Sequence, residues 1–377
     1  MHSFTQVDIS RAILQHFGAD HERPTFIPDD SQAVILWIAD GFGLNLWHDY
    51  SNRGLMPEIS KQDPTIFPGH SIFPTTTAAG LASYAFAAPP AIHGALGFWI
   101  YLPEIGRSVN MLTGRDETGQ EAPPDILYPP MPTIFTRLAS HGIASAVVSP
   151  APYQTSSLSQ WLYSGATYVP YPVKSPLEAV NRVRESISAG CRFVWVYWPY
   201  IDAAAHRTGL TSPRTEAAIT QLDAAYGYAV SQWQFPFKVT IIVSADHGMM
   251  ALSPTHVIAK SEPYMADIWN KAWAGERRAL TTALSLGDVK DRLKDIATVY
   301  AQEEIWEKGW YGGAPARPAW RQRVLNTLAL AHPLYQFEQD PARDTPIMSA
   351  AHGALTPDET DIPISVQTLE HKHYNHR

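Results

Sequence analysis

The sequence predicts an α/β protein with a mostly parallel central sheet, helices on both faces of the sheet and a small cap insertion. Short, continuous apolar runs recur along the chain, which is typical of strands buried on both faces. Candidate helices separate these runs, as crossover connections do in parallel sheets. Acidic residues or histidines directly follow three of the runs, at the strand ends where such folds bind ligands.

The expected elements alternate along the chain as this fold requires. Apolar runs predict buried strands at residues 33–39, 143–148, 193–197 and 239–243. Helical patterns occupy the intervening and following segments at residues 132–141, 177–189 and 213–234. A turn that begins at Phe73 leads into a further helical run that ends near Ala87.

Length and composition indicate one large domain with an inserted segment. The chain has 377 residues, of which 45% are hydrophobic and 17% charged, so it can fill a sizeable core. Residues 252–345 are richer in lysine, arginine, tryptophan and proline. We therefore predict an α/β core from residues 1–251 and 346–377 and a cap from residues 252–345. The histidine-rich end, residues 371–377, is interpreted as a solvated tail.

Charge and cysteine content exclude several classes of protein. The net charge of −8 argues against binding to nucleic-acid polymers, which favours a basic surface. A single cysteine, Cys191, excludes an intramolecular disulfide framework. The N-terminus lacks the basic and apolar regions of a signal peptide, so we expect a cytoplasmic protein. Residues 71–103 carry no charged side chain, but prolines and threonines interrupt them, which favours buried core over a membrane span.

Carboxylates and imidazoles at the predicted strand ends indicate a metal centre. Asp40 follows the first strand, and Asp202 follows the third, four residues before His206. Residues four apart share one face of a helix, so both side chains could reach one ion. The remaining candidates are Asp246 and His247 after the fourth strand, and His352 between two small residues. Oxygen and nitrogen ligands of this kind suit Zn²⁺, Mn²⁺ or Fe.

A hydroxyl group near these ligands would supply a nucleophile. Three threonines, Thr75, Thr76 and Thr77, stand at the start of the helical run after Phe73. A helix N-terminus favours an anion, and a bound cation would lower the pKa of a hydroxyl there. Capping of the helix is the alternative role for these threonines.

The set of motifs resembles the alkaline phosphatase superfamily, and most closely its nucleotide pyrophosphatase/phosphodiesterase branch. That branch has Phe-Pro-Thr-x-Thr, found here at residues 73–77, and a His-Gly sixteen residues later, found at His93. It also has Asp-x-x-x-His-Arg-x-Gly and Asp-His-Gly-Met, found at residues 202–209 and 246–249. The matches extend from about Val34 to His352.

The resemblance implies a hydrolase with two divalent metal ions, usually zinc. One ion would be held by Asp202, His206 and His352. The other would be held by Asp40, Thr77, Asp246 and His247. Thr77 would attack phosphorus in line, and water would then hydrolyse the phosphothreonine. The expected partner is a small phosphodiester or nucleotide, and the sequence does not specify the oligomeric state.

The chain departs from the pattern of this branch around the substrate. Residues 78–80 are Ala-Ala-Gly, where the branch has an aromatic wall beside its nucleophile. The phosphate-binding asparagine that closely follows the His-Gly is missing, and Asn110 is a candidate substitute. Phe42 and Tyr200 are candidates for substrate contacts or, alternatively, for core packing.

Several functions stay open on the sequence alone. The absence of Lys and Arg from residues 71–103 favours a diester or pyrophosphate substrate, since a monoester carries one more negative charge. Arg115 or Arg207 could supply that cation, so phosphomonoesterase activity is an alternative. A phosphonoacetate hydrolase-like enzyme would use the same threonine and metals. A metal-binding relative without catalytic activity is the alternative from a different class.

Overall fold

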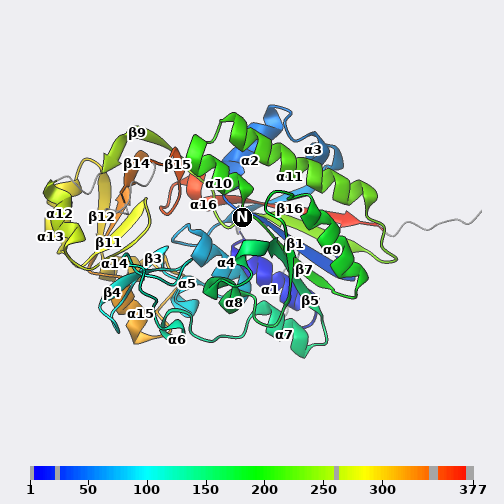
Figure 1. The fold of residues 1–377 in the computed structure, drawn as a ribbon, viewed down its shortest axis with the longest axis horizontal. Coiled ribbons are helices and arrows are strands. Elements are labelled where there is room, and N and C mark those ends of the chain that lie inside the picture. The colour runs from blue at the N-terminus through cyan, green and yellow to red at the C-terminus, as the bar shows by residue number, and fades with distance from the viewer. Residues whose placement is uncertain (1–3, 22–25, 259–262, 339–346, 371–377) are drawn as a thin grey trace, which may run out of the picture.

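A computed structural model describes residues 4–21, 26–258, 263–338 and 347–370. Figure 1 shows two regions side by side, a large α/β region around one sheet and a smaller region around a second sheet. The histidine-rich end, residues 371–377, lies outside the described residues. Within the described part, no helix is both long and apolar enough to cross a membrane.

The large sheet has seven strands in the order β2-β16-β8-β1-β7-β5-β6. Its five strands from β8 to β6 run parallel to one another, while β16 is antiparallel to both β8 and β2. The predicted fold class, a mostly parallel sheet, is therefore confirmed. The strands are β1 (Ala33–Ala39), β2 (Thr65–His70), β5 (Ser145–Pro150), β6 (Thr167–Tyr171), β7 (Phe193–Trp198), β8 (Val239–Ser244) and β16 (Asp361–Leu369).

Helices cover both faces of this sheet, because its central strands are apolar on both sides. Along β1, Val34, Leu36 and Ile38 pack into one core cluster, and the alternate residues pack into another. The first cluster includes side chains of α1 (Gln6–His16), α4 (Thr77–Phe86), α7 (Ile134–Ser140) and α8 (Ser157–Leu162). The second includes side chains of α2 (Leu44–Asn52), α3 (Pro57–Gln62), α9 (Glu178–Ser188), α10 (Tyr200–Thr208) and α11 (Pro213–Gln232).

Three strands of the large sheet were not predicted, and each contains a proline. Pro68 lies in β2 and Pro170 in β6, the two edges of the sheet, and Pro363 of β16 pairs with Pro68. Proline lacks an N–H for the ladder and is tolerated mainly on edge strands. These segments therefore carry a weaker strand signal than the four predicted runs.

The second sheet has six antiparallel strands in the order β12-β13-β11-β10-β3-β4. Most of them come from the predicted cap: β10 (Trp273–Gly275), β11 (Ala279–Thr282), β12 (Ala297–Ala301) and β13 (Thr327–Ala331). The other two, β3 (Trp99–Leu102) and β4 (Arg107–Asn110), come from a much earlier part of the chain. We refer to this six-stranded region as the cap. The cap segment expected from the sequence, residues 252–345, supplies four of its strands, and its boundaries stay a prediction.

The remaining elements are short. A three-stranded sheet of β14 (Leu334–Phe337), β9 (Met250–Ile258) and β15 (Ala350–Ala351) lies between β8 and β16 in the chain. The cap segment also contains four helices, α12 (Pro263–Trp269), α13 (Leu286–Leu293), α14 (Gln302–Glu307) and α15 (Pro318–Arg323). Single turns are formed by α5 (Pro90–His93), α6 (Pro124–Leu127), η1 (Ala151–Tyr153) and α16 (Pro357–Thr360).

Candidate metal centre and active site

Three aspartates meet at the carboxyl ends of neighbouring parallel strands. Asp40 follows β1, Asp246 lies just beyond β8, and Asp202 lies in the first turn of α10 after β7. Because β1 lies between β7 and β8, these strand ends are adjacent. The Asp202 N–H donates to the Asp40 carbonyl at 3.1 Å, and the Gly41 N–H donates to Asp246 Oδ1 at 3.2 Å.

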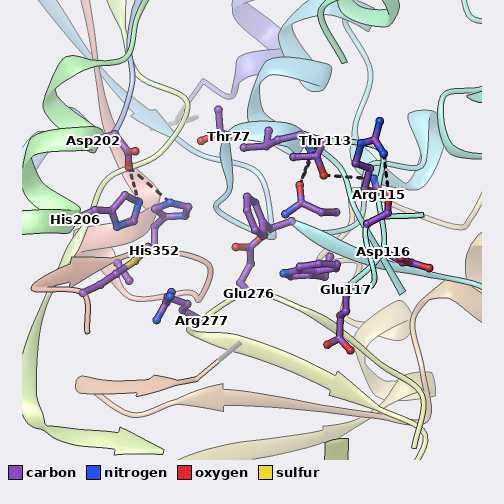
Figure 2. Close-up of a pocket in the computed structure, with 17 residues that line it drawn as sticks. Thr77, Thr113, Arg115, Asp116, Glu117, Asp202, His206, Glu276, Arg277 and His352 are labelled. Carbon is purple, nitrogen blue, oxygen red and sulfur yellow. Dashed lines mark hydrogen bonds and ion pairs between the residues drawn. The ribbon is translucent and has the colours of Figure 1, made fainter. Parts of the chain in front are cut away.

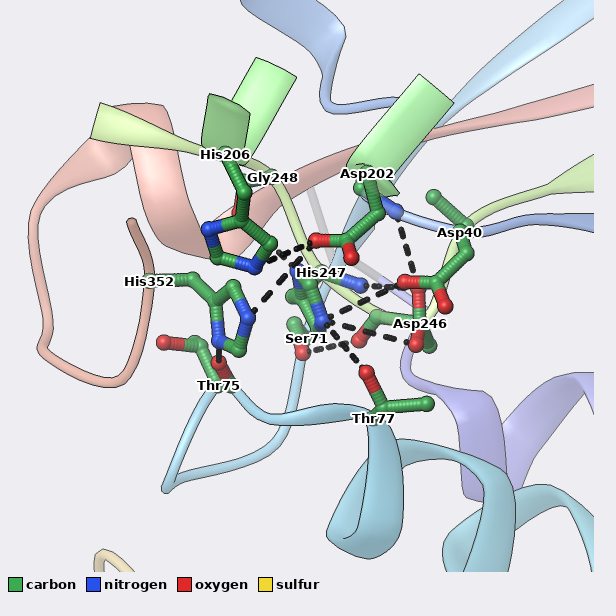
Figure 3. Close-up of polar contacts among 12 residues, drawn as sticks. Asp40, Ser71, Thr75, Thr77, Asp202, His206, Asp246, His247, Gly248 and His352 are labelled. Carbon is green, nitrogen blue, oxygen red and sulfur yellow. Dashed lines mark hydrogen bonds and ion pairs between the residues drawn. The ribbon is translucent and has the colours of Figure 1, made fainter. Parts of the chain in front are cut away.

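The histidines and Thr77 converge on the same place (Figure 3). Nε2 of His247 lies 3.5 Å from Asp40 Oδ1, 3.4 Å from Asp246 Oδ2 and 3.3 Å from Thr77 Oγ1. Two sets of ligand atoms each lie within 4.8 Å of one another and could hold an ion. They are Asp40 with Asp246 and His247, and Asp202 with His247 and His352.

His206 completes the second set. Its Nε2 lies 2.9 Å from Asp202 Oδ1, and Nε2 of His352 lies 3.7 Å from the same oxygen. All seven side chains predicted as metal ligands therefore gather in one place. His247 contributes to both sets, whereas the resemblance assigns it to one ion.

The three imidazoles are oriented by the backbone. Nδ1 of His206 lies 2.8 Å from the Ala350 carbonyl, and Nδ1 of His352 lies 2.7 Å from the Thr75 carbonyl. Nδ1 of His247 lies 3.0 Å from the Gly248 carbonyl. A carbonyl only accepts, so we assign the proton to Nδ1 in each ring. Each Nε2 is then a lone-pair donor, which is how proteins present histidine to a metal.

The carboxylates hold buried oxygens that lack a hydrogen-bond partner. These atoms are Asp40 Oδ1, Asp202 Oδ1 and Asp246 Oδ2. The other oxygen of Asp40 accepts a hydrogen bond from the Tyr197 hydroxyl. Burial raises the pKa of Asp40 well above its ordinary value, and repulsion from Asp246 and Asp202 raises it further. Buried, unpaired acceptors that repel one another fit divalent cations, which would satisfy and neutralise them.

The two histidines beside Asp202 differ in pKa. Burial alone would lower the pKa of His206, but the charge and hydrogen bond of Asp202 raise it above its ordinary value. Burial alone would raise the pKa of Asp202, but the adjacent imidazoles of His206 and His352 lower it below its ordinary value. Burial, together with His247 and His206, lowers the pKa of His352 well below its usual range. A neutral imidazole and an ionised carboxylate are the forms that bind a metal.

The three threonines have different roles. Thr75 is fully buried, and its hydroxyl donates to the Ala354 carbonyl at 2.9 Å and accepts from the Gly353 N–H at 2.8 Å. Thr76 occupies the N-cap position of α4, but its side chain makes no capping hydrogen bond. Thr77 is the partly exposed one, and its hydroxyl lies beside His247 at the start of α4. The geometry therefore favours Thr77 as the nucleophile.

A cavity of about 450 Å³ opens beside these residues, between the core and the cap (Figure 2). Thr77, Asp202, His206 and His352 line its core side. The opposite side includes Trp99 at the start of β3, Asn110 at the end of β4, and Glu276 and Arg277 from the turn between β10 and β11.

A family model shows what kind of protein this is. The model described as type I phosphodiesterase / nucleotide pyrophosphatase matches residues 34–354. The chain belongs to this family. Its members are hydrolases that act on phosphodiester and pyrophosphate bonds. No curated protein sequence matches the chain.

Solved structures agree with the family in fold. Murine ectonucleotide pyrophosphatase / phosphodiesterase 5 has a TM-score of 0.65 at 19% identity, covering 89% of this chain and 88% of that one. An inactive threonine-to-alanine variant of that protein, in complex with AMP, has the same scores. Phosphonoacetate hydrolase from Sinorhizobium meliloti, in complex with phosphonoformate, has a TM-score of 0.64 at 17% identity, covering 90% of each chain.

The small residue Gly80, three residues after Thr77 in this phosphodiesterase-family chain, is required by packing. A Cβ atom on Gly80 would lie 2.8 Å from Cβ of Asp246 and 3.0 Å from its carbonyl oxygen. The first turn of α4 therefore lies directly against the strand end that carries Asp246. A bulky side chain at this position would displace either Thr77 or the loop that carries Asp246.

His93 of the family-like His-Gly motif is structural. Its ring is fully buried, with Nε2 3.0 Å from Ser83 Oγ, and Nδ1 accepts from the Ala95 N–H at 3.1 Å. Burial lowers the pKa of His93 to about 3, so the ring is neutral over the ordinary pH range. The motif ties α5 to α4, the helix that carries Thr77.

The predicted substrate contacts differ in their placement. Asn110 lines the cavity, and its Oδ1 accepts from the Leu112 N–H at 2.9 Å, which leaves its NH₂ group as the end able to donate to a ligand. Phe42 is fully buried in a core cluster against Trp47, and the Tyr200 hydroxyl donates to the Val173 carbonyl at 3.0 Å. Neither Phe42 nor Tyr200 is among the described residues that line the cavity. Their placement therefore does not support the predicted contact with substrate.

Sequence reasoning missed the residues that reach the cavity from the cap. Glu276 and Arg277 belong to no motif, and only the path of the β10–β11 turn brings them to the cavity. Tyr197 was also missed, although its place near the end of the third apolar run could have suggested contact with a neighbouring strand end.

Proposed function

We propose that the protein is a metal-dependent phosphodiesterase or nucleotide pyrophosphatase that acts on a small molecule, with Thr77 as its nucleophile. The observation that carries this proposal is the convergence of Thr77 Oγ1 with buried, unpaired carboxylate oxygens and three Nε2 atoms. Family membership supports the class of reaction.

Two divalent ions would be held by residues that already face one another. Asp202, His206 and His352 would bind one ion. Asp40, Asp246, His247 and Thr77 would bind the other. Zn²⁺ suits these ligands best, and Mn²⁺ or Fe would also accept them. Such a pair of ions supplies positive charge that lowers the pKa of a hydroxyl and neutralises phosphoryl oxygens.

The residues of the chain then carry out two displacements. Thr77 Oγ1 gives its proton to solvent and attacks phosphorus, and the departing group leaves with the electron pair of its bond to phosphorus. The threonine ester is hydrolysed by water, which restores the hydroxyl of Thr77. The N-terminus of α4 favours the negative charge that develops at this oxygen.

The lack of Lys and Arg around Thr77 favours a diester or pyrophosphate, whereas Arg115 in the cavity wall keeps phosphomonoesterase activity as an alternative. In the described lining, the cationic side chains are Arg115 and Arg277, which come from outside the nucleophile segment. Neither belongs to the segment 71–103, which carries no Lys or Arg. A phosphonoacetate hydrolase-like activity is the second candidate, favoured by the fold shared with the phosphonoacetate hydrolase from S. meliloti.

Hydrolysis of bis-p-nitrophenyl phosphate tests the proposal. We expect activity with Zn²⁺ or Mn²⁺ and its loss on chelation. Thr77→Ala should lose at least about a thousandfold in kcat while still binding metal, and Thr77→Ser should retain part of the activity. His352→Ala should lose both activity and metal, because it removes a ligand.

Metal content and rate together separate the roles of these residues. Full activity in Thr77→Ala would refute Thr77 as the nucleophile. Two ions per chain in His352→Ala would remove His352 from the ligand set. A purified, metal-loaded protein without any hydrolytic activity would favour the non-catalytic relative instead.

A further inference from the structure

In the set of candidate ligands around Asp40, one oxygen of each carboxylate already accepts a hydrogen bond from the protein. Oδ2 of Asp40 accepts from the Tyr197 hydroxyl. Oδ1 of Asp246 accepts from the N–H groups of Gly41 and His247, at 3.2 and 3.1 Å. The remaining oxygens, Asp40 Oδ1 and Asp246 Oδ2, are buried and have no hydrogen-bond partner. Each carboxylate therefore presents a single unpartnered oxygen to an ion.

These hydrogen bonds limit the Asp40 set to four available donor atoms. Besides the two oxygens, the set contains Nε2 of His247, which lies 3.5 Å from Asp40 Oδ1 and 3.4 Å from Asp246 Oδ2. The fourth donor is Oγ1 of Thr77, 3.3 Å from the same nitrogen. Zn²⁺ commonly takes about four ligands of mixed oxygen and nitrogen type, whereas Mn²⁺ takes about six and favours oxygen. A set with few oxygens therefore favours Zn²⁺.

The Tyr197 hydroxyl is held against Asp40 by the pairing of two strands. Tyr197 of β7 pairs with Ile38 of β1, and the Asp40 N–H donates to the Trp198 carbonyl at 3.0 Å. The Tyr171 hydroxyl donates to the Tyr197 carbonyl at 2.8 Å, and the Tyr197 side chain is buried. Both partners of the hydrogen bond are thus fixed by backbone contacts on neighbouring strands.

Loss of this hydroxyl would change what Asp40 can offer to an ion. Asp40 is 2% exposed, so water cannot readily replace the phenol as a donor. A buried carboxylate oxygen without a donor is costly, and binding to the ion would remove that cost. Asp40 could then bind through both of its oxygens. An additional oxygen ligand suits Mn²⁺ better than Zn²⁺.

We propose that Tyr197 is a positioning residue that leaves Asp40 one metal-binding oxygen and thereby makes the Asp40 set select Zn²⁺ over Mn²⁺. This role rests on the metal centre of the proposed function. The other set consists of Asp202, His206 and His352 and does not include Asp40. Its preference among ions should therefore not depend on Tyr197.

Metal binding by the full chain, measured without substrate, tests this role. Metal-free protein is titrated with Zn²⁺ and separately with Mn²⁺ against a competing chelator, which gives a dissociation constant for each ion. The proteins are the wild type, Tyr197→Phe and the matched control Tyr171→Phe. Each is also made with His206→Ala, which weakens the other set so that the Asp40 set can be measured. The control removes a phenol that bonds to the backbone of Tyr197 and not to Asp40.

We expect Tyr197→Phe to lower the Zn²⁺ affinity of the Asp40 set by about 10- to 100-fold. The Mn²⁺ affinity should fall less or rise, so the ratio of the two affinities should shift toward Mn²⁺ at least about tenfold. Tyr171→Phe should leave this ratio unchanged. A general loosening of the site would weaken the binding of both ions alike, so the ratio separates selection from loss of structure.

An unchanged ratio in Tyr197→Phe, with or without a fall in both affinities, would overturn this role of Tyr197 and leave the proposed function intact. A shift of the same size in Tyr171→Phe would also overturn it, because that change leaves the hydroxyl beside Asp40 in place. A wild type that binds neither Zn²⁺ nor Mn²⁺ would contradict the metal centre of the proposed function itself.

Discussion

At the scale of single residues, several candidate metal ligands are held by contacts made far away in the sequence. His352 is oriented by the carbonyl of Thr75, and His206 by the carbonyl of Ala350. The Asp246 carbonyl accepts from the hydroxyl of Ser71 at 2.6 Å and from Gln6 Nε2 at 2.6 Å. Spacing in the sequence could indicate which residue types bind metal. It could not indicate these supporting contacts, because backbone carbonyls leave no mark in a sequence.

Glu276 makes a residue-scale prediction about pH. Burial raises its pKa from 4.5 to about 8, so the folded state keeps a proton that the unfolded state loses as the pH rises. Stability is therefore lost progressively between about pH 4.5 and pH 8, by up to about 5 kcal/mol. Glu276→Gln removes this penalty, so its melting temperature relative to the wild type should rise by several degrees from pH 5 to pH 9. A constant difference across this range would show that Glu276 ionises normally.

At the scale of elements, the sequence predicted the strands that are buried on both faces of the large sheet. The runs at 33–39, 193–197 and 239–243 became β1, β7 and β8, while the run at 143–148 became β5, shifted by two residues. These strands lie inside the sheet, where continuous apolar sequence is required on both faces. The cap strands were missed because they are short and antiparallel, and because β3, the partner of β4, joins the sheet through β10, more than 150 residues later.

The ion pair between Arg278 and Glu359 makes a prediction at the element scale. Both side chains are fully buried, so removing one partner leaves an uncompensated charge in the interior. Arg278→Met or Glu359→Gln alone should destabilise the protein by about 3–5 kcal/mol, measured as a large fall in melting temperature. The double variant should be less destabilised than the sum of the two single changes. Strict additivity would indicate that the pair does not couple the cap to the core.

At the scale of the whole molecule, the candidate site lies where the α/β core and the cap meet. The large sheet brings together the predicted ligands, and the order of its strands explains why residues as distant as Asp40 and Asp246 become neighbours. The cap contributes the opposite wall of the cavity through Glu276 and Arg277. Sequence motifs therefore indicated the side chains that gather at the candidate site but not the opposite wall of the cavity, which depends on contacts across the two regions.

The stereochemical course at phosphorus tests the central claim most directly. A chiral phosphorothioate diester, hydrolysed in ¹⁸O-labelled water by the Zn²⁺-loaded protein, reports how many in-line displacements occur. Attack by Thr77 followed by attack of water inverts the phosphorus centre twice, so we predict net retention of configuration. Net inversion would mean that water attacks the substrate directly, and it would contradict Thr77 as the nucleophile.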